Sequence, residues 1–470
     1  MTKWQLFLGA GACTVIVACT HEQASVAIVA PPPPKVAAPP AASTAAPKEA
    51  SLPPPAKVEE CKPIETQLPE IAHEDFDVDV PEIEDATAEA MAPLYEKMAL
   101  LLRGKATDHI RIGMYGDSNM TMDWITGRIR RLLQQKYGDA GHGFVALAKP
   151  WTWYHHNDVK HDLWLDSWIN FAVSTAPAVD HLVGFAGIAA QSKHEGAVTW
   201  VETAPLGNPI GTTASRFDLY YLQRKGAGTF KVVVDGAKLQ DVDAAGDVPT
   251  AQFLHFELPD AAHKVTFVAT SNKPVRLFGL SLERGTPSFV VDSLGCGALS
   301  AQQMAEREDQ TINEQTLAHR HYDLVLDLVG TNMWDAAKLP LHWKTILDTH
   351  KKAMPGAAIM MMSPPDTAES VSAPHSDKRI VMVADLKRKI AAENKVAFWD
   401  FRGAMGGDLS IVRFKRHKMA WGDLIHFNDK GAAYMADRIV YAIWRDFMKW
   451  LEKHPQAGCT PVAPNVAAIP

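Results

Sequence analysis

The chain of 470 residues lacks an excess of basic residues, and it lacks a long hydrophobic run after its first segment. Lysine and arginine number 47 against 54 aspartate and glutamate residues, which gives a net charge of −7. The charges are spread along the chain, so we expect no nucleic-acid partner. No segment beyond residue 18 is long and apolar enough to cross a bilayer. Cysteine is also scarce, with five residues in the whole chain.

The N-terminal residues have the pattern of a secretion signal. Lys3 supplies a positive charge, and the stretch from Trp4 to Ala18 is apolar or small. Residues 16–19 (Ile-Val-Ala-Cys) resemble the lipobox of bacterial lipoproteins, which implies a signal peptide over 1–18 and lipidation of Cys19. An ordinary signal peptide that happens to contain cysteines is the alternative. Thr20 follows the cysteine in place of Asp, and in a Gram-negative cell this implies an outer-membrane lipoprotein that faces the periplasm.

Residues 19–60 are predicted to be a tether. The stretch from about 30 to 56 is mostly proline and alanine, a composition that favours extended polyproline conformation and cannot bury a core. Together with an acyl anchor at Cys19, such a tether suggests that the protein reaches a nearby surface polymer. Cys61 ends the tether and Cys459 follows the last predicted helix, so a Cys61–Cys459 disulfide is predicted for an oxidising compartment.

Two segments, 61–169 and 288–455, are predicted to form one α/β domain, followed by a tail over 456–470. Strands are predicted at 110–115, 290–292, 323–329, 357–362 and 396–400, and helices at 119–137, 300–319, 341–352, 377–393 and 428–452. Strands that alternate with helices imply a parallel sheet covered on both faces.

The segment between them, 170–287, has no helical periodicity. Short alternating runs recur at 217–222, 229–234, 253–258, 265–269 and 275–282, and Asp235-Gly236 between two such runs is a strong hairpin signal. We therefore predict an inserted all-β sandwich. Such a domain could bind carbohydrate or could be purely structural, and the pattern does not distinguish the two.

A group of polar residues follows the predicted strands of the α/β domain. Gly116-Asp117-Ser118 follows the first strand, Gly297 lies after the second, and Gly330-Thr331-Asn332 follows the third. Asp423 and His426 precede the last helix. In open α/β sheets the carboxyl edge of the strands is where sites are built.

These blocks resemble, in order and position, those of the SGNH (GDSL-like) hydrolases. The resemblance implies a three-layer α/β/α fold with a flavodoxin-like parallel sheet. It identifies Ser118 as a nucleophile that needs a base. His426 takes that role, and Asp423 orients its ring. The backbone N–H groups of Ser118 and Gly297 and the side-chain amide of Asn332 would form the oxyanion hole.

The chain departs from the family pattern at two places. Asn119 stands where many members have Leu, and Met333 stands where many have Asp; we expect neither to bear on a catalytic role. Cys296, beside Gly297, is interpreted as a small buried residue rather than a second nucleophile. Serine chemistry needs no cofactor, and none is predicted. His155, His156 and His161 lack the partner spacing of a metal site, so no metal is predicted.

Within the superfamily the layout is most similar to bacterial peptidoglycan O-acetylesterases, which carry an inserted β-sandwich. The resemblance implies an esterase that removes O-acetyl groups from an O-acetylated cell-wall glycan, acting in the cell envelope as a monomer. A lipase or lysophospholipase, an O-acetyltransferase and a catalytically silent glycan-binding lipoprotein are the alternatives. Aromatic residues between 151 and 168 would stack on sugars if exposed, or form the seam between sheet and sandwich if buried; the seam is the favoured interpretation.

Overall fold

A central parallel sheet organises the α/β part of this computed structural model, which describes residues 63–459 apart from 72, 77, 334 and 371. The strand order is β14-β2-β15-β16-β19, with the short antiparallel strand β1 at the edge beside β19. The bounds are β1 (Ile83–Glu84), β2 (Ile110–Gly116), β14 (Phe289–Gly295), β15 (Leu324–Asp327), β16 (Ala358–Met362) and β19 (Ala397–Trp399). Numbered along the chain, the five parallel strands follow the order 2-1-3-4-5, which is the flavodoxin-like order that was predicted.

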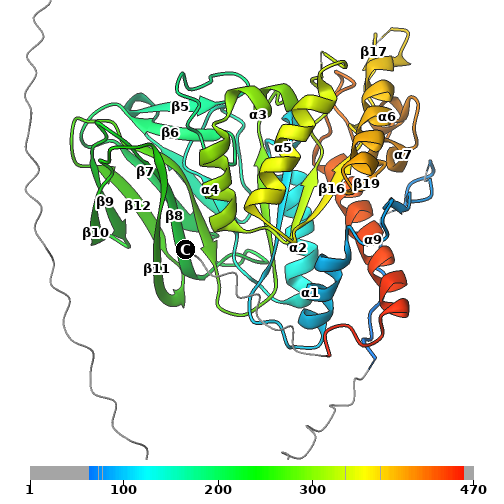
Figure 1. The fold of residues 1–470 in the computed structure, drawn as a ribbon, viewed down its shortest axis with the longest axis horizontal. Coiled ribbons are helices and arrows are strands. Elements are labelled where there is room, and N and C mark those ends of the chain that lie inside the picture. The colour runs from blue at the N-terminus through cyan, green and yellow to red at the C-terminus, as the bar shows by residue number, and fades with distance from the viewer. Residues whose placement is uncertain (1–62, 72, 77, 334, 371, 460–470) are drawn as a thin grey trace, which may run out of the picture. The chain divides into compact units, whose positions relative to one another are not determined.

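Helices cover both faces of this sheet (Figure 1). One face carries α1 (Ala92–Leu102), α2 (Trp124–Tyr137), α7 (Phe401–Met405) and α9 (Asp429–Lys453). The other carries α3 (Ala301–Arg307), α4 (Gln310–Arg320), α5 (Leu339–Ala353) and α6 (Lys378–Glu393). A further short helix, α8 (Ser410–Arg416), precedes the loop that leads to α9. The predicted three-layer α/β/α arrangement is therefore confirmed.

Successive side chains of a strand point to opposite faces of the sheet, so each buried strand contributes to two different hydrophobic cores. Leu324 and Leu326 of β15 pack with α1, α2 and α9, whereas Val325 packs with the helices of the opposite face. Because both sides of each strand are buried, the strands read as continuous apolar runs rather than alternating ones.

The inserted domain is a pair of antiparallel sheets (Figure 1). One has the order β10-β9-β12-β7-β4, and the other β11-β8-β13-β6-β5, with β3 also paired to β13. The bounds are β3 (Gly143–Ala146), β4 (Val159–Leu163), β5 (Trp168–Ala172), β6 (Ile188–Ser192), β7 (Val198–Thr203), β8 (Ala214–Gln223), β9 (Thr229–Val234), β10 (Ala237–Asp243), β11 (Thr250–Ala261), β12 (Lys264–Ala269) and β13 (Arg276–Glu283). The predicted Asp235-Gly236 hairpin joins β9 to β10, with φ of 50° and 85° at its two central residues.

The sandwich begins earlier than the predicted boundary at residue 170. Strands β3 and β4 and the first two residues of β5 lie before it, and these strands pair with β13, β7 and β6 respectively. These strands are short, and β4 (Val-Lys-His-Asp-Leu) carries three polar side chains. A short polar strand has little hydrophobic alternation, which is why the sequence pattern did not reveal it.

Several predictions concern residues outside the described range. The signal peptide, Cys19 and the tether lie there, as does Cys61. Cys459 is disulfide-bonded, while the Cys61–Cys459 pairing itself stays a prediction. Within the part of the chain that the structure describes, none of the helices combines the length and apolar character needed to span a membrane.

Candidate active site

Ser118 lies directly after the strand β2, in a tight turn. A 3-10 helix over Ser118–Met120 begins there, and the Asp117 side chain accepts a hydrogen bond from the backbone N–H of Asn119 at its start. Gly116 ends the strand where a Cβ atom would collide with the Met120 side chain. The turn therefore needs glycine at that position, and it places Ser118 at the carboxyl edge of the sheet, partly exposed.

Ser118, His426 and Asp423 form a continuous chain of hydrogen bonds. Ser118 Oγ lies 2.7 Å from His426 Nε2, and His426 Nδ1 lies 2.7 Å from Asp423 Oδ2. These distances are the ones that a nucleophile, a base within proton-transfer reach and a carboxylate that orients the ring would need. The structure thus brings together the three residues that the resemblance identified.

Asp423 is held by backbone groups of its own loop as well as by the imidazole. Its Oδ1 accepts hydrogen bonds from the N–H groups of Ile425 at 3.0 Å and His426 at 3.1 Å. Partial burial would raise the pKa of Asp423, but the hydrogen bonds from His426 and Ile425 outweigh it and lower the pKa. The carboxylate therefore stays ionised at neutral pH, as orientation of His426 requires.

Asn119 fixes the backbone on both sides of His426. Its Oδ1 accepts from the N–H of Phe427 at 2.9 Å, and its Nδ2 donates to the carbonyl of Ile425 at 3.3 Å. The expectation that Asn119 has no bearing on a catalytic role stays untested, but its amide makes two contacts with the His426 loop that a leucine could not make. The departure from the family pattern was visible in the sequence, but only the structure reveals which loop the amide reaches.

The two remaining oxyanion candidates, Gly297 and Asn332, line the same cavity as Ser118. Gly297 follows β14, and a Cβ built on it would lie 3.1 Å from the indole of Trp151. Its carbonyl accepts a hydrogen bond of 2.5 Å from Ser174 Oγ. Asn332 Nδ2 donates to the carbonyl of Leu299 at 3.3 Å, so its amide is tied to the loop that follows Gly297.

Ser174 is a contact that sequence reasoning missed. It follows β5, so it belongs to the sandwich, yet its hydroxyl holds the loop that contains Gly297. It also lies 3.3 Å from Cys296 Sγ. Cys296 itself is fully buried, and burial raises the pKa of its thiol to about 12. The interpretation of Cys296 as a buried residue rather than a nucleophile is consistent with this, because a thiol with that pKa is not a thiolate at neutral pH.

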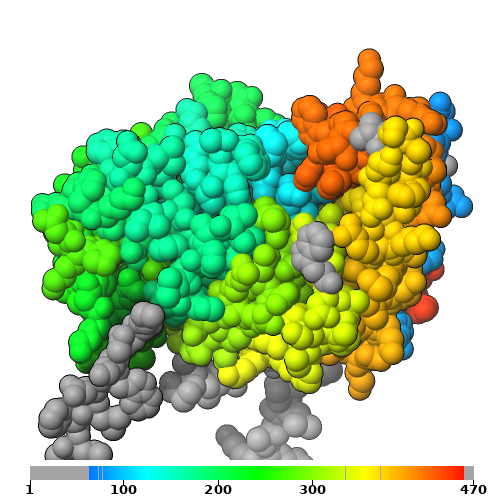
Figure 2. All heavy atoms as spheres, turned by 90° about the horizontal axis from the view of Figure 1, so that it is seen from above, coloured from blue at the N-terminus to red at the C-terminus, as the bar shows by residue number. Residues whose placement is uncertain are grey.

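The cavity around Ser118 has a volume of about 970 Å³. Its lining comes from segments far apart in the chain, which meet on the face seen in Figure 2: the cyan segment around 120–150, the yellow-green segment around 300 and the orange segment around 420. Four tryptophans contribute to it, Trp124, Trp151, Trp153 and Trp421, as does Arg379.

The aromatic residues between 151 and 168 divide into two groups. Tyr154 and Trp168 are buried, and Trp168 Nε1 donates to the carbonyl of Val198 inside the sandwich. Trp153 and Trp164 are instead more than half exposed. Tyr154 and Trp168 are thus buried, as a seam would require, whereas Trp153 and Trp164 are not. Trp151 lies between the two groups, because it is partly buried against the core and also lines the cavity.

Three buried residues near α2 could be mistaken for a metal site. Potential ligand atoms of Asp123, His142 and His156 lie within 4.8 Å of one another. However, both carboxylate oxygens of Asp123 bind the buried guanidinium of Arg130, at 2.9 and 3.2 Å. A second cation would be repelled by Arg130 and would find the Asp123 oxygens already engaged. The cluster fits a hydrogen-bonded network better than a metal centre, and His155 and His161 are not part of it.

Comparison with known proteins supports the fold. No family model and no curated protein matches the chain by sequence. Among solved structures, a peptidoglycan O-acetylesterase superposes with a TM-score of 0.66 at 21% identity, over 78% of this chain and 99% of the other. This chain therefore shares its fold with that esterase, and the shared fold covers nearly the whole of the esterase.

Two further matches are much looser. A family two carbohydrate esterase from Clostridium thermocellum is 11% identical over 61% of this chain and 98% of its own, with a TM-score of 0.27. A GDSL-like lipase from Parabacteroides merdae, itself described as putative, is 16% identical over 34% of this chain and 74% of its own, with a TM-score of 0.28. Neither score is high enough to support a conclusion about this chain.

Proposed function

We propose that the protein is a serine esterase that removes O-acetyl groups from cell-wall glycan. The observation that carries the proposal is the hydrogen-bonded chain Ser118–His426–Asp423 at the carboxyl edge of the sheet. The fold shared with a peptidoglycan O-acetylesterase supports the choice of an acetylated glycan as substrate. The predicted lipid anchor at Cys19 would place a monomeric enzyme beside that polymer, at the outer membrane of a Gram-negative cell.

In the proposed reaction, His426 Nε2 accepts the Ser118 hydroxyl proton as Oγ attacks the acetyl carbonyl. The negative charge that develops on the carbonyl oxygen is stabilised by the N–H groups of Ser118 and Gly297 and by the Asn332 amide. Collapse breaks the bond to the sugar oxygen, which leaves with the proton from His426. Water then attacks the acetyl-enzyme, His426 takes its proton, and acetate and free Ser118 are released.

The decisive test replaces the nucleophile. Ser118→Ala is expected to lower acetate release from O-acetylated peptidoglycan by about 10⁴-fold or more, since a triad without its nucleophile loses nearly all of its rate enhancement. Peptidoglycan stripped of its acetyl groups by mild base is the blank, and an unchanged circular dichroism spectrum shows that the variant folds. Full activity in Ser118→Ala would eliminate the mechanism.

The competing activities give different products. A lipase would hydrolyse octanoyl and palmitoyl aryl esters faster than acetyl esters. An O-acetyltransferase would form an acetylated sugar when an acceptor oligosaccharide is supplied in excess, in place of free acetate. A catalytically silent binding protein would release no acetate from O-acetylated peptidoglycan or from an aryl acetate. Its Ser118→Ala variant would give the same result as the natural chain in both assays.

A further inference from the structure

The cavity around Ser118 is much larger than the removal of an acetyl group requires. Its volume of about 970 Å³ lies at the upper end of the ~300–1,000 Å³ that ligand pockets usually span. The acetyl group itself needs only the space beside Ser118, Gly297 and Asn332. Most of the cavity must therefore serve whatever carries the acetyl group.

The lining distinguishes between an acyl chain and a sugar chain. Among the described residues that line the cavity there are four tryptophans, one phenylalanine, one isoleucine and one methionine, but no leucine or valine. Polar side chains are interleaved with the aromatic rings; besides Ser118, Asp423 and His426 they are Asn119, Thr121, Thr175, Thr331, Asn332, Thr367, Asp377 and Arg379. An acyl groove is best lined by aliphatic side chains, whereas a sugar presents a C–H face that packs on indole and a rim of hydroxyls that need hydrogen-bonding partners.

Two of the tryptophans are largely open to solvent. The exposed fraction is 54% for Trp153 and 55% for Trp421. Each therefore leaves apolar ring surface in water inside the cavity, although burial of an aromatic ring is strongly favourable. Exposed apolar surface within a cavity that also contains an aligned nucleophile is typical of a ligand-binding surface.

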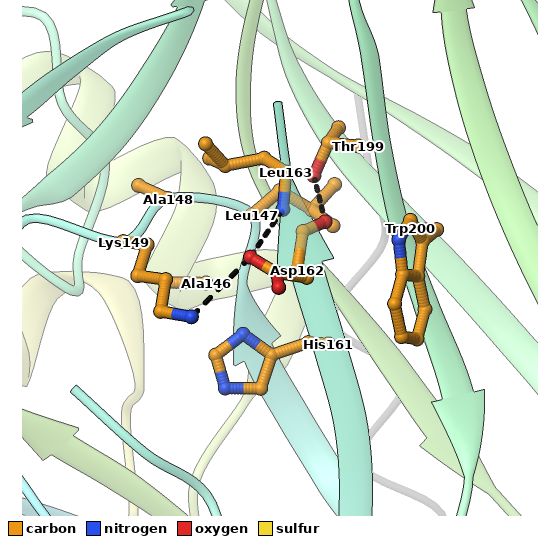
Figure 3. A pocket seen from close by; sticks show the side chains of 9 residues that line it. All are labelled: Ala146, Leu147, Ala148, Lys149, His161, Asp162, Leu163, Thr199 and Trp200. Carbon is orange, nitrogen blue, oxygen red and sulfur yellow. Dashed lines mark hydrogen bonds and ion pairs between the residues drawn. The ribbon is translucent and has the colours of Figure 1, made fainter. Parts of the chain in front are cut away.

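The loop that contains Trp151 and Trp153 is fastened at both ends. At one end, the Lys149 N–H donates to Asn170 Oδ1 at 2.7 Å, and the Lys149 ammonium points to Asp162 of β4 at 3.3 Å (Figure 3). At the other end, the His155 N–H donates to the carbonyl of Thr121, close to the nucleophile. The backbone that carries Trp153 is thus held at both ends before a ligand arrives, which lowers the entropic cost of binding.

Trp421 is fastened to the catalytic loop itself. The backbone N–H of Trp421 donates to the backbone carbonyl of His426 at 2.8 Å, while the indole ring stays exposed. The two exposed rings therefore come from opposite parts of the chain, one from the start of the sandwich and one from the loop before α9, and both border the cavity with Ser118.

We propose that this cavity is a cleft for several consecutive sugar residues, in which Trp153 and Trp421 are stacking platforms. The inference rests on the proposed function, since it states how the same site holds its glycan. It adds that recognition extends beyond the acetylated sugar, so that affinity grows with the length of the chain that is bound.

The experiment measures binding separately from catalysis. The Ser118→Ala protein is titrated with N-acetylglucosamine and its dimer and tetramer by isothermal calorimetry. We expect the tetramer to bind at least 10-fold more tightly than the dimer. Trp153→Ala and Trp421→Ala, each added to Ser118→Ala, should weaken tetramer binding about 5- to 20-fold, because each removes a stacking contact of the aromatic kind. Trp421→Phe should retain most of the affinity, since the ring face and the backbone contact to His426 remain.

Trp164→Ala is the matched control, because Trp164 is 59% exposed but does not line the cavity. It should bind the tetramer as the parent does. Tetramer binding that is absent, independent of chain length, or equal in the two tryptophan variants and the control would overturn the inference. So would loss of palmitoyl-ester hydrolysis in Trp153→Ala, which would mean that the cleft holds an acyl chain. The two proposals can also be separated. If the tryptophan variants bind the tetramer weakly but the natural chain releases no acetate from O-acetylated peptidoglycan, the sugar-binding cleft is supported and the proposed function is refuted.

Discussion

At the scale of single residues, the amide of Asn119 determines how His426 is held. It bonds to the residue before His426 and to the residue after it, and its own position is next to Ser118 in the chain. We therefore predict that the separation of Ser118 Oγ from His426 Nε2 depends on Asn119, which would act as a positioning residue for the backbone of the loop that carries His426.

Asn119→Leu tests this role, since leucine matches the size of the side chain but makes neither hydrogen bond. We expect kcat on an aryl acetate to fall about 10- to 100-fold with a smaller change in KM, because a displacement of about 1 Å can cost ~100-fold in rate. Asn119→Asp keeps the acceptor for Phe427 and loses the donor to Ile425, so its kcat should be intermediate. Equal kcat in the natural chain and Asn119→Leu would show that the loop needs no such support.

At the scale of elements, most strands and helices of the α/β part follow from hydrophobic pattern. The terminal helix was predicted at 428–452 and is observed as α9, Asp429–Lys453. Among the strands that were missed, β4 lies at a sheet edge and carries mostly polar residues, whereas β6 and β7 lie inside their sheets. For β4, packing rather than alternation decides the strand state. For the site, the family blocks located Ser118 and His426. The contacts of Asn119 and Ser174 could not be predicted, because they join segments separated by more than a hundred residues.

One predicted helix, 300–319, is two helices in the structure. It breaks at Glu308, where α3 ends in extended backbone and Asp309 caps α4. Glu308 is buried, and Asn313 Nδ2 donates to its carboxyl group at 2.5 Å. Burial raises the pKa of Glu308 to about 8, although the hydrogen bond from Asn313 opposes the shift. A helix break at a single buried carboxyl group does not alter the hydrophobic periodicity of the sequence, so the periodicity could not predict it.

This pKa makes stability depend on pH in a definite direction. Between the unfolded value, about 4.3, and about 8, the folded state holds a proton that the unfolded state has lost. The free energy of unfolding should therefore fall as pH rises through this window, by at most ~1.4 kcal/mol per pH unit from this group. Glu308→Gln should remove that contribution, which urea midpoints at pH 5, 7 and 9 would measure. Glu393→Gln, at an exposed site on α6, is the control; a pH dependence equal in both variants would refute the assignment.

At the scale of the whole molecule, the sandwich and the α/β part share one core. Residues of β8 and β13 in the sandwich belong to the same buried cluster as α4, α5 and the side chains on the face of the parallel sheet that α3 to α6 cover. A buried charge network crosses the same boundary. Glu283, the last residue of β13, accepts from Arg111 of β2 at 2.8 Å and from Arg320 of α4 at 2.5 Å. Arg320 in turn bonds to Asp292 of β14 at 2.7 Å.

Substitution of Glu283 should therefore destabilise the sandwich and the α/β part together. Burial alone would raise the pKa of Glu283, but Arg320 and Arg111 hold it well below its usual range, so the carboxylate is charged at neutral pH. Glu283→Ala leaves two guanidinium groups short of a counter-charge in a buried place, which typically costs about 3–5 kcal/mol. We expect one unfolding transition in both proteins, shifted to lower urea in the variant, with coincident far-ultraviolet circular dichroism and tryptophan fluorescence. The control is Glu257→Ala, at an exposed position of β11, which should leave the midpoint within error. Two separate transitions, with only one of them moved by Glu283→Ala, would mean that the sandwich folds independently and that the charge network does not join it to the α/β part.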